Sequence, residues 1–227
     1  MSAARSLARI RRLPSTTSAT PVALPTVFIV DDDISVRESL QGLIVDAGWR
    51  PQVFACAEEF LAHPRQPTPG CLVLDVGLPD LNGLELQKRI AGRPELPIIF
   101  ITGHGDVPMT VQAMKAGAVE FLTKPFGPEF LLSAIDGAIE RSRASLAQEA
   151  GLQVLRDRYA SLTARERQVL ALVVRGQLNK QVGFELGIRE ITVKIHRGQV
   201  MRKMAASSFA ELVNMAARLG LATGGKR

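Results

Sequence analysis

The stretch CLVLD, residues 71–75, is an apolar run that ends in a single carboxylate. Four apolar residues followed by an acid are typical of a buried parallel strand whose last residue emerges at the edge of the sheet. Leu78-Pro79 turns the chain just beyond it. Asp75 is therefore the first candidate for a chemically active side chain at that edge.

Three more predicted strands also end in polar side chains. Residues 26–30 lead into Asp31-Asp32-Asp33, residues 97–101 into Thr102, and residues 119–122 into Thr123-Lys124. In an open α/β sheet the ligand site lies outside the carboxyl ends of the strands. We therefore expect acids, a hydroxyl and an ammonium group to meet at one edge of a parallel sheet.

This set of side chains suits magnesium-assisted phosphoryl transfer. Several carboxylates in one pocket need a counter-charge, and oxygen-only ligands select a hard cation such as Mg²⁺. The metal and Lys124 would neutralise the phosphoryl oxygens, and Thr102 would offer them a hydrogen bond, while Asp75 attacks. The expected product is an aspartyl phosphate.

Charge divides the chain into unlike parts. Residues 1–23 carry four Arg and no acids, residues 24–159 carry twelve Lys and Arg against eighteen acids, and residues 160–227 carry twelve against four. A basic module behind an acidic one indicates a polyanionic partner, nucleic acid rather than a membrane.

No apolar run approaches the about 18 residues of a membrane span. Cys56 and Cys71 lack metal or redox spacing, so we expect a cytoplasmic protein without a membrane partner.

The basic part of the chain predicts an all-helical module. Thr163 and Glu166 have the spacing of a capping box. Further helices are expected from Leu178 to Gly187, from Arg189 to Met204 and from Phe209 to Leu219. Two short helices joined by a Gly-containing turn, the second one basic, are typical of a helix-turn-helix whose second helix enters the major groove.

The faces of that second helix follow from its period of 3.6 residues. Val193, Val200 and Met204 are expected on the core side, with His196 packed among them rather than serving as a metal ligand. Lys194 and Arg197 are expected to project from the opposite face, where they can meet phosphates or guanine edges.

In order and spacing, these motifs resemble the response regulators of bacterial two-component systems, specifically the FixJ-like branch of the FixJ/NarL type. In the receiver half the resemblance rests on Val30-Asp31-Asp32-Asp33, Asp75, Leu78-Pro79, Asn82-Gly83, residues 101–109, residues 114–118 and Lys124-Pro125-Phe126. In the DNA-binding half it rests on residues 162–170, Asn179-Lys180, residues 185–188 and residues 192–197.

The resemblance implies a flavodoxin-like (βα)5 receiver with a central parallel sheet, followed by an all-α LuxR-type helix-turn-helix domain. The expected parts of the chain are a disordered basic extension (1–23), the receiver (24–142), a helical linker (143–160), the DNA-binding domain (161–221) and a tail (222–227). The extension superficially looks like an organellar transit peptide, but a bacterial extension or an overlong gene start is the interpretation we prefer.

For the receiver, the resemblance also implies a role for each site residue. Asp75 is the phosphoacceptor and a magnesium ligand, Asp32 a direct ligand, Asp31 a ligand through water, and Gly77 a ligand through its backbone carbonyl. Thr102 is the switch hydroxyl, Phe121 the aromatic residue that moves with it, and Lys124 the phosphate-binding lysine before a cis-Pro125. Asp33 is interpreted as a helix cap, and His104 as a solvated loop residue rather than a group that controls access to the site.

For the DNA-binding domain, the residues expected at the DNA are Lys180, Thr192, Lys194, Ile195, Arg197 and Gly198. Two glycines depart from the family pattern. Gly183 stands where alanine is common, and Gly198 where a longer side chain often contacts DNA. Gly198 either permits close approach of the backbone or forfeits a contact, and the sequence leaves both open.

The function expected from these features is that of a DNA-binding transcriptional regulator rather than an enzyme, apart from its own phosphoryl transfer and dephosphorylation. Its expected partners are a sensor histidine kinase, promoter DNA, a second copy after phosphorylation, and RNA polymerase if it is an activator. Two alternatives stay open. One is a metal-dependent phosphohydrolase with its nucleophile in residues 31–33, and the other is a DNA-binding protein that works without phosphorylation.

Overall fold

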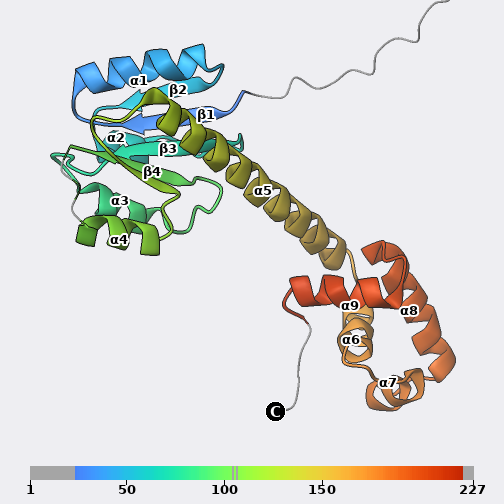
Figure 1. Ribbon diagram of the computed structural model, residues 1–227. Coiled ribbons are helices and arrows are strands. Elements are labelled where there is room, and N and C mark those ends of the chain that lie inside the picture. The colour runs from blue at the N-terminus through green and yellow to red at the C-terminus, as the bar shows by residue number, and fades with distance from the viewer. Residues whose placement is uncertain (1–23, 104, 106, 222–227) are drawn as a thin grey trace, which may run out of the picture.

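The chain has an α/β part and an all-helical part at opposite ends of one long helix, as the computed structural model shows (Figure 1). It describes residues 24–103, 105 and 107–221. The expectations for residues 1–23, His104, Asp106 and residues 222–227 lie outside the described residues.

Five parallel strands form one sheet in the order β2-β1-β3-β4-β5. Their bounds are β1 (Thr26–Val30), β2 (Arg50–Phe54), β3 (Gly70–Asp75), β4 (Ile98–Thr102) and β5 (Glu120–Thr123). The three inner strands are buried along their whole length, as their continuous apolar sequences require. The predicted parallel sheet is confirmed, with β2 added at its edge.

Helices cover both faces of this sheet (Figure 1). They are α1 (Ile34–Asp46), α2 (Ala57–Ala62), α3 (Gly83–Arg89), α4 (Val107–Lys115) and the first half of α5 (Pro128–Ala160). Successive strand residues point to opposite faces. Accordingly, Val73 packs with residues of α1 and α5, whereas Leu72 and Leu74 pack with residues of α2, α3 and α4. These two cores make the expected flavodoxin-like receiver fold.

The long helix α5 changes partners along its length. Its buried residues in the receiver end at Ser142, and the next buried one, Leu155, belongs to the core of the helical part. The Ser142 hydroxyl accepts a hydrogen bond from Gly70 N at 3.0 Å and donates one to the Glu95 carbonyl at 2.5 Å. A serine within a helix gives no sequence signal for such a contact, because both partners, Gly70 and Glu95, are distant along the chain.

Within the described residues, four helices follow α5. They are α6 (Ala164–Val173), α7 (Asn179–Leu186), α8 (Glu190–Met204) and α9 (Phe209–Arg218). The predicted capping box is present, because Thr163 Oγ1 accepts from Glu166 N at 3.2 Å and Glu166 Oε2 accepts from Thr163 N at 2.8 Å. Gly187 ends α7 in the left-handed conformation, with φ of 67°, which glycine adopts without steric cost. The predicted helix-turn-helix is therefore formed by α7 and α8.

Candidate functional site

Three side chains from distant parts of the chain meet at the carboxyl ends of the strands. Asp31 follows β1, Asp75 ends the neighbouring strand β3, and Lys124 follows β5. Lys124 Nζ donates to Asp31 Oδ2 at 2.7 Å and to Asp75 Oδ1 at 2.9 Å. The predicted meeting of acids and an ammonium group at this edge is thus observed for these three residues.

The two carboxylates of Asp31 and Asp75 together carry more negative charge than Lys124 neutralises, so the site favours a further positive charge. Asp31 is 1% exposed, and this burial raises the pKa of its carboxyl group. The hydrogen bond from Lys124 lowers the pKa, but burial has the larger effect. Burial alone would lower the pKa of Lys124, but its hydrogen bonds to Asp31 and Asp75 outweigh burial and raise it. Lys124 therefore stays charged, and one ammonium group serves two carboxylates.

The other acids near this edge have different surroundings. Asp33 caps α1 by accepting a hydrogen bond from Ser35 N at 2.8 Å, which confirms the predicted cap. Asp32 is exposed beside them. Gly77 N donates to Asp75 Oδ2, which fixes the second oxygen of that carboxylate.

These donors fit a magnesium ion by their chemistry. All are oxygen atoms, and Mg²⁺ typically binds through one or two carboxylates while it keeps several waters. Among the described residues no three acidic, histidine or cysteine side chains already gather in a metal-ligating group. Asp31 and Asp75, with the exposed Asp32 nearby, supply the excess negative charge that such an ion would neutralise.

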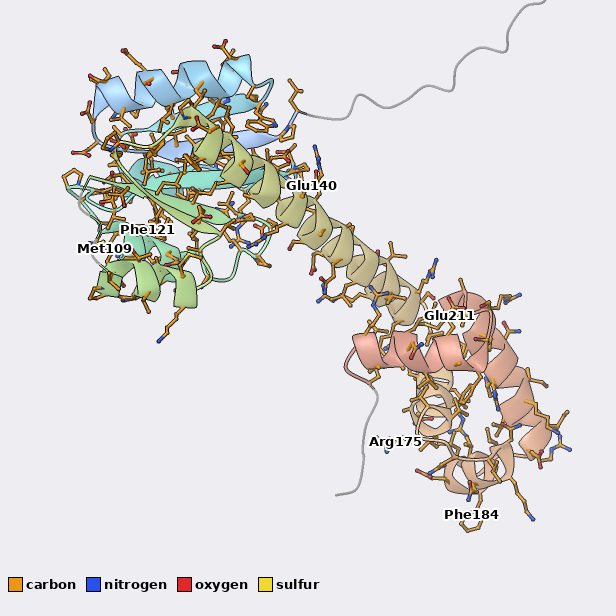
Figure 2. The ribbon with its side chains drawn as sticks, viewed as in Figure 1. Met109, Phe121, Glu140, Arg175, Phe184 and Glu211 are labelled. Atoms are coloured by element: carbon orange, nitrogen blue, oxygen red, sulfur yellow. The ribbon has the colours of Figure 1, made fainter. Side chains whose placement is uncertain are left out.

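The hydroxyl and the aromatic side chain of the predicted switch lie next to this pocket. Thr102 ends β4 and is buried, and its carbonyl accepts a hydrogen bond from Lys124 N at 2.7 Å. Phe121 on β5 is partly buried, with its ring centroid 6.0 Å from that of Phe100. It lies close to Met109 of α4 in Figure 2, and both side chains pack against the same core. The Lys124–Pro125 peptide bond is cis, as expected.

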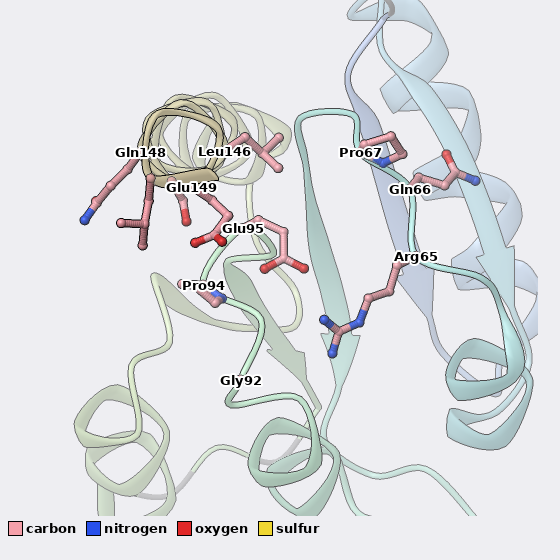
Figure 3. A pocket seen from close by; sticks show the side chains of 11 residues that line it. Arg65, Gln66, Pro67, Gly92, Pro94, Glu95, Leu146, Gln148 and Glu149 are labelled. Atoms are coloured by element: carbon pink, nitrogen blue, oxygen red, sulfur yellow. The ribbon is translucent and has the colours of Figure 1, made fainter. Parts of the chain in front are cut away.

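A separate cavity of about 730 Å³ lies at the opposite ends of the strands (Figure 3). It is bounded by α5 and by the loops that precede β3 and β4, and its lining includes Arg65, Glu95 and Glu149. None of the predicted site residues lines it. The carboxylate chemistry belongs to the other edge of the sheet.

The helix-turn-helix presents most of the predicted DNA-contacting residues to solvent. Lys180 of α7 and Lys194, Ile195 and Gly198 of α8 are exposed, and Thr192 is partly exposed. Val193, Val200 and Met204 of α8 are buried, as predicted, and His196 is partly buried.

Arg197 departs from the prediction. It lies one helical turn after Val193 and hence near the same face, not opposite it. Its guanidinium group lies 4.5 Å from the centroid of the Phe209 ring, and Nη1 donates to Asn179 Oδ1 at 3.4 Å. The expectation that Arg197 projects away from the core is therefore wrong, because an aromatic residue on α9 holds its side chain. Lys194 instead remains exposed and pairs with Glu190 at 3.1 Å, one turn earlier.

Comparisons with known families agree with this architecture. Residues 27–136 match the response regulator receiver domain, and residues 160–216 match the bacterial regulatory proteins of the luxR family. The chain belongs to the response regulators that join a receiver to a LuxR-type DNA-binding domain, a family of transcriptional regulators.

Relatives that are 44–48% identical cover most of the chain. Nodulation protein W of Bradyrhizobium diazoefficiens is 48% identical over 196 residues, 86% of each chain. The response regulator protein TodT of Pseudomonas putida is 45% identical over 194 residues, 85% of this chain and 86% of its own. The transcriptional regulatory protein FixJ of Rhizobium meliloti is 44% identical over 192 residues, 84% of this chain and 94% of its own.

Two solved structures superpose on most of the chain. The response regulator StyR superposes with a TM-score of 0.72 at 49% identity, over 86% of this chain and all of its own. Full-length FixJ from B. japonicum superposes with a TM-score of 0.51 at 42% identity, over 88% of this chain and 98% of its own. The resemblance to the FixJ-like branch is thereby confirmed.

No helix among the described residues combines the length and the apolar character that crossing a lipid bilayer demands.

Proposed function

We propose that a sensor histidine kinase phosphorylates Asp75 and that this phosphorylation controls dimerisation and promoter binding. The observation that carries the proposal is the bridge from Lys124 to both Asp31 and Asp75 at the strand ends. It places a carboxylate nucleophile beside a cation that can take up the charge of the incoming phosphoryl group.

In the proposed step, an Asp75 oxygen attacks the phosphorus of a phosphohistidine. The new O–P bond forms as the N–P bond breaks, and the leaving imidazole recovers a proton from solvent. Lys124 then neutralises phosphoryl oxygens, and the Thr102 hydroxyl donates a hydrogen bond to one of them. A magnesium ion held by Asp32, Asp75 and the Gly77 carbonyl, and by Asp31 through water, would supply further charge neutralisation. Later hydrolysis of the aspartyl phosphate would be the only other reaction of this chain.

The phosphoryl group would change the surface around α4 and β5. Its added charge draws Thr102 and Lys124 inward, and the space left by Thr102 lets Phe121 bury further. This surface already exposes the apolar side chains Val107, Val111 and Met114 of α4. We propose that the altered surface pairs two copies of the chain, so phosphorylation acts as a population shift between existing arrangements.

The output would come from the helix-turn-helix in the cytoplasm. Lys180, Thr192, Lys194, Ile195 and Gly198 would face promoter DNA, and RNA polymerase would be a further partner of an activator. We place the receiver at residues 24–142, the helical linker at 143–160 and the DNA-binding domain at 161–221. The receiver boundary is supported by the buried residues of α5, which stop at Ser142. The last residues of the linker, Leu155 and Tyr159, already pack in the core of the DNA-binding domain.

A labelling experiment tests the proposal. The full chain is incubated with radiolabelled acetyl phosphate and Mg²⁺, and the acid-labile label is counted for wild type, Asp75→Asn and Asp33→Asn. We expect no label on Asp75→Asn and normal label on Asp33→Asn, because asparagine caps a helix as well as aspartate does. Undiminished labelling of Asp75→Asn would move the nucleophile to residues 31–33 and support the phosphohydrolase alternative.

A further inference from the structure

The exposed face of α8 carries a stripe without charge. Ile191, Ile195 and Gly198 follow one another at intervals of four and three residues, which places them on one side of the helix, away from Val193 and Val200. Ile191 is 56% exposed and Ile195 58%. We call these three residues the α8 stripe.

Charged residues border the stripe but do not cover it. Lys194 pairs with Glu190, and Arg197 is held by Phe209 and Asn179. Residues 160–227 carry twelve Lys and Arg against four acids, so the surroundings attract a polyanion. The major groove of DNA presents one apolar group at its base edges, the 5-methyl group of thymine. An apolar stripe within a basic domain is complementary to that group.

Gly198 is not required by the packing of the protein. A Cβ atom built at Gly198 meets nothing within 4 Å, whereas one built at Gly183 lies 2.8 Å from the Ile188 carbonyl oxygen. Gly183 is therefore needed where α7 meets the turn, but Gly198 only weakens its helix relative to alanine. The space above Gly198 is open to a partner from outside the domain.

We propose that Ile191 and Ile195 recognise thymine methyl groups. Gly198, which lies one turn after Ile195, lets the α8 backbone approach the DNA closely at that point. Sequence discrimination then comes from these apolar contacts together with a polar contact made by Lys194. This inference rests on the proposed function, in which α8 is the helix that enters the major groove.

Methyl recognition is tested by removing single methyl groups from DNA. A duplex is selected from random-sequence DNA with the full-length protein in the presence of acetyl phosphate and Mg²⁺, and each thymine is then replaced in turn by deoxyuridine. We expect one or more replacements to weaken binding by about fourfold per lost methyl contact. Ile191→Ala or Ile195→Ala should abolish that discrimination at its own position, whereas Val154→Ala, at an exposed aliphatic residue of α5, should retain it.

The outcomes separate the two proposals. Equal binding of thymine and deoxyuridine duplexes, or discrimination that persists in both isoleucine variants, would overturn methyl recognition while DNA binding stands. Failure to select any duplex would overturn the proposed function and this inference together.

Gly198→Ala tests the close approach. The added methyl group meets open space in the protein, so we expect a higher thermal midpoint for the DNA-binding domain, together with binding weakened by about tenfold. A gain in stability with unchanged affinity would show that the backbone does not approach the DNA there.

Discussion

Lys124 Nζ lies 2.9 Å from Asp75 Oδ1 and 2.7 Å from Asp31 Oδ2. The ammonium group thus reaches from the end of β5 past the ends of β4 and β3 to the residue after β1. It occupies the charge-neutralising position that a divalent cation would share, so Lys124 and magnesium should compete for the same negative charge.

Lys124→Gln should therefore change two measurements in opposite directions. Magnesium binding, followed by calorimetry, should tighten, because Asp31 and Asp75 lose their ammonium partner. The initial rate of phosphate labelling should fall on the order of a hundredfold, because the phosphoryl oxygens lose a preorganised positive charge. Lys88→Gln is the matched control, since Lys88 pairs with Glu85 on the receiver surface. Weaker magnesium binding by the Lys124 variant would contradict the competition.

Asp32→Asn should weaken magnesium binding, because it removes a hard, charged oxygen ligand at an exposed position that water and ions reach freely. We expect a loss of about tenfold or more in the magnesium affinity measured by titration of the full chain. Asp33→Asn should leave the titration unchanged, because the carboxylate of Asp33 is occupied by the amide of Ser35. If magnesium affinity fell only in the Asp33 variant, Asp33 rather than Asp32 would be the magnesium ligand.

Elements buried on both faces could be predicted from the sequence, whereas an exposed edge and contacts between side chains distant along the chain could not. The strands β1, β3 and β4 were predictable because strands buried on both faces are continuous apolar runs, and the rule of strand ends then brought Asp31, Asp75 and Lys124 together. The edge strand β2 (Arg50–Phe54) gave no such signal, because it is short, contains a proline and pairs, within the described residues, with β1 alone.

The misplacement of Arg197 has a different origin. Helical periodicity gives the direction in which a residue leaves its helix, but not the partner that a long side chain finds. Phe209 comes from α9, beyond the end of α8, and its ring takes up the guanidinium group. The bond between Ser142 and Gly70, 72 residues apart, was unpredictable for the same reason.

Arg197→Ala should accordingly lower the stability of the DNA-binding domain. Loss of the stacking on Phe209 and of the bond to Asn179 should cost the DNA-binding domain about 1 kcal/mol in the free energy of unfolding. Lys194→Ala should leave stability unchanged, because its ion pair with Glu190 is exposed. It should instead cost about 1–3 kcal/mol of binding on the selected DNA site alone. Urea unfolding and binding over a salt series measure the two effects, and equal stability of the two variants would refute the assignment for Arg197.

Acid should weaken the helical domain through Glu166. Hydrogen bonds from Lys203 and from the Thr163 amide hold the pKa of its carboxyl group below the ordinary 4.5. Because the folded-state pKa is the lower one, this contribution to stability is complete above about pH 4.5 and is lost as the pH falls through the folded-state pKa.

Glu166→Gln keeps a capping-box side chain but loses the charge that pairs with Lys203. The variant should be less stable than wild type by up to about 1 kcal/mol near neutral pH, and the difference should close in acid. Urea unfolding at a series of pH values measures it. A difference that is constant with pH would mean that the ion pair with Lys203 contributes nothing.

Residues 150–227 should fold and bind DNA on their own. The cut keeps Leu155 and Tyr159 of α5, which pack in the core formed by α6, α8 and α9. A fragment of residues 161–227 loses both side chains and should be less stable by about 2 kcal/mol or more.

In the described part of the chain, the receiver and α8 lie toward opposite ends of α5 (Figure 1), so we expect the longer fragment to bind DNA as tightly as the unphosphorylated full chain. Tighter binding by the fragment would show instead that the receiver masks the helix-turn-helix, whereas equal binding favours activation through dimerisation.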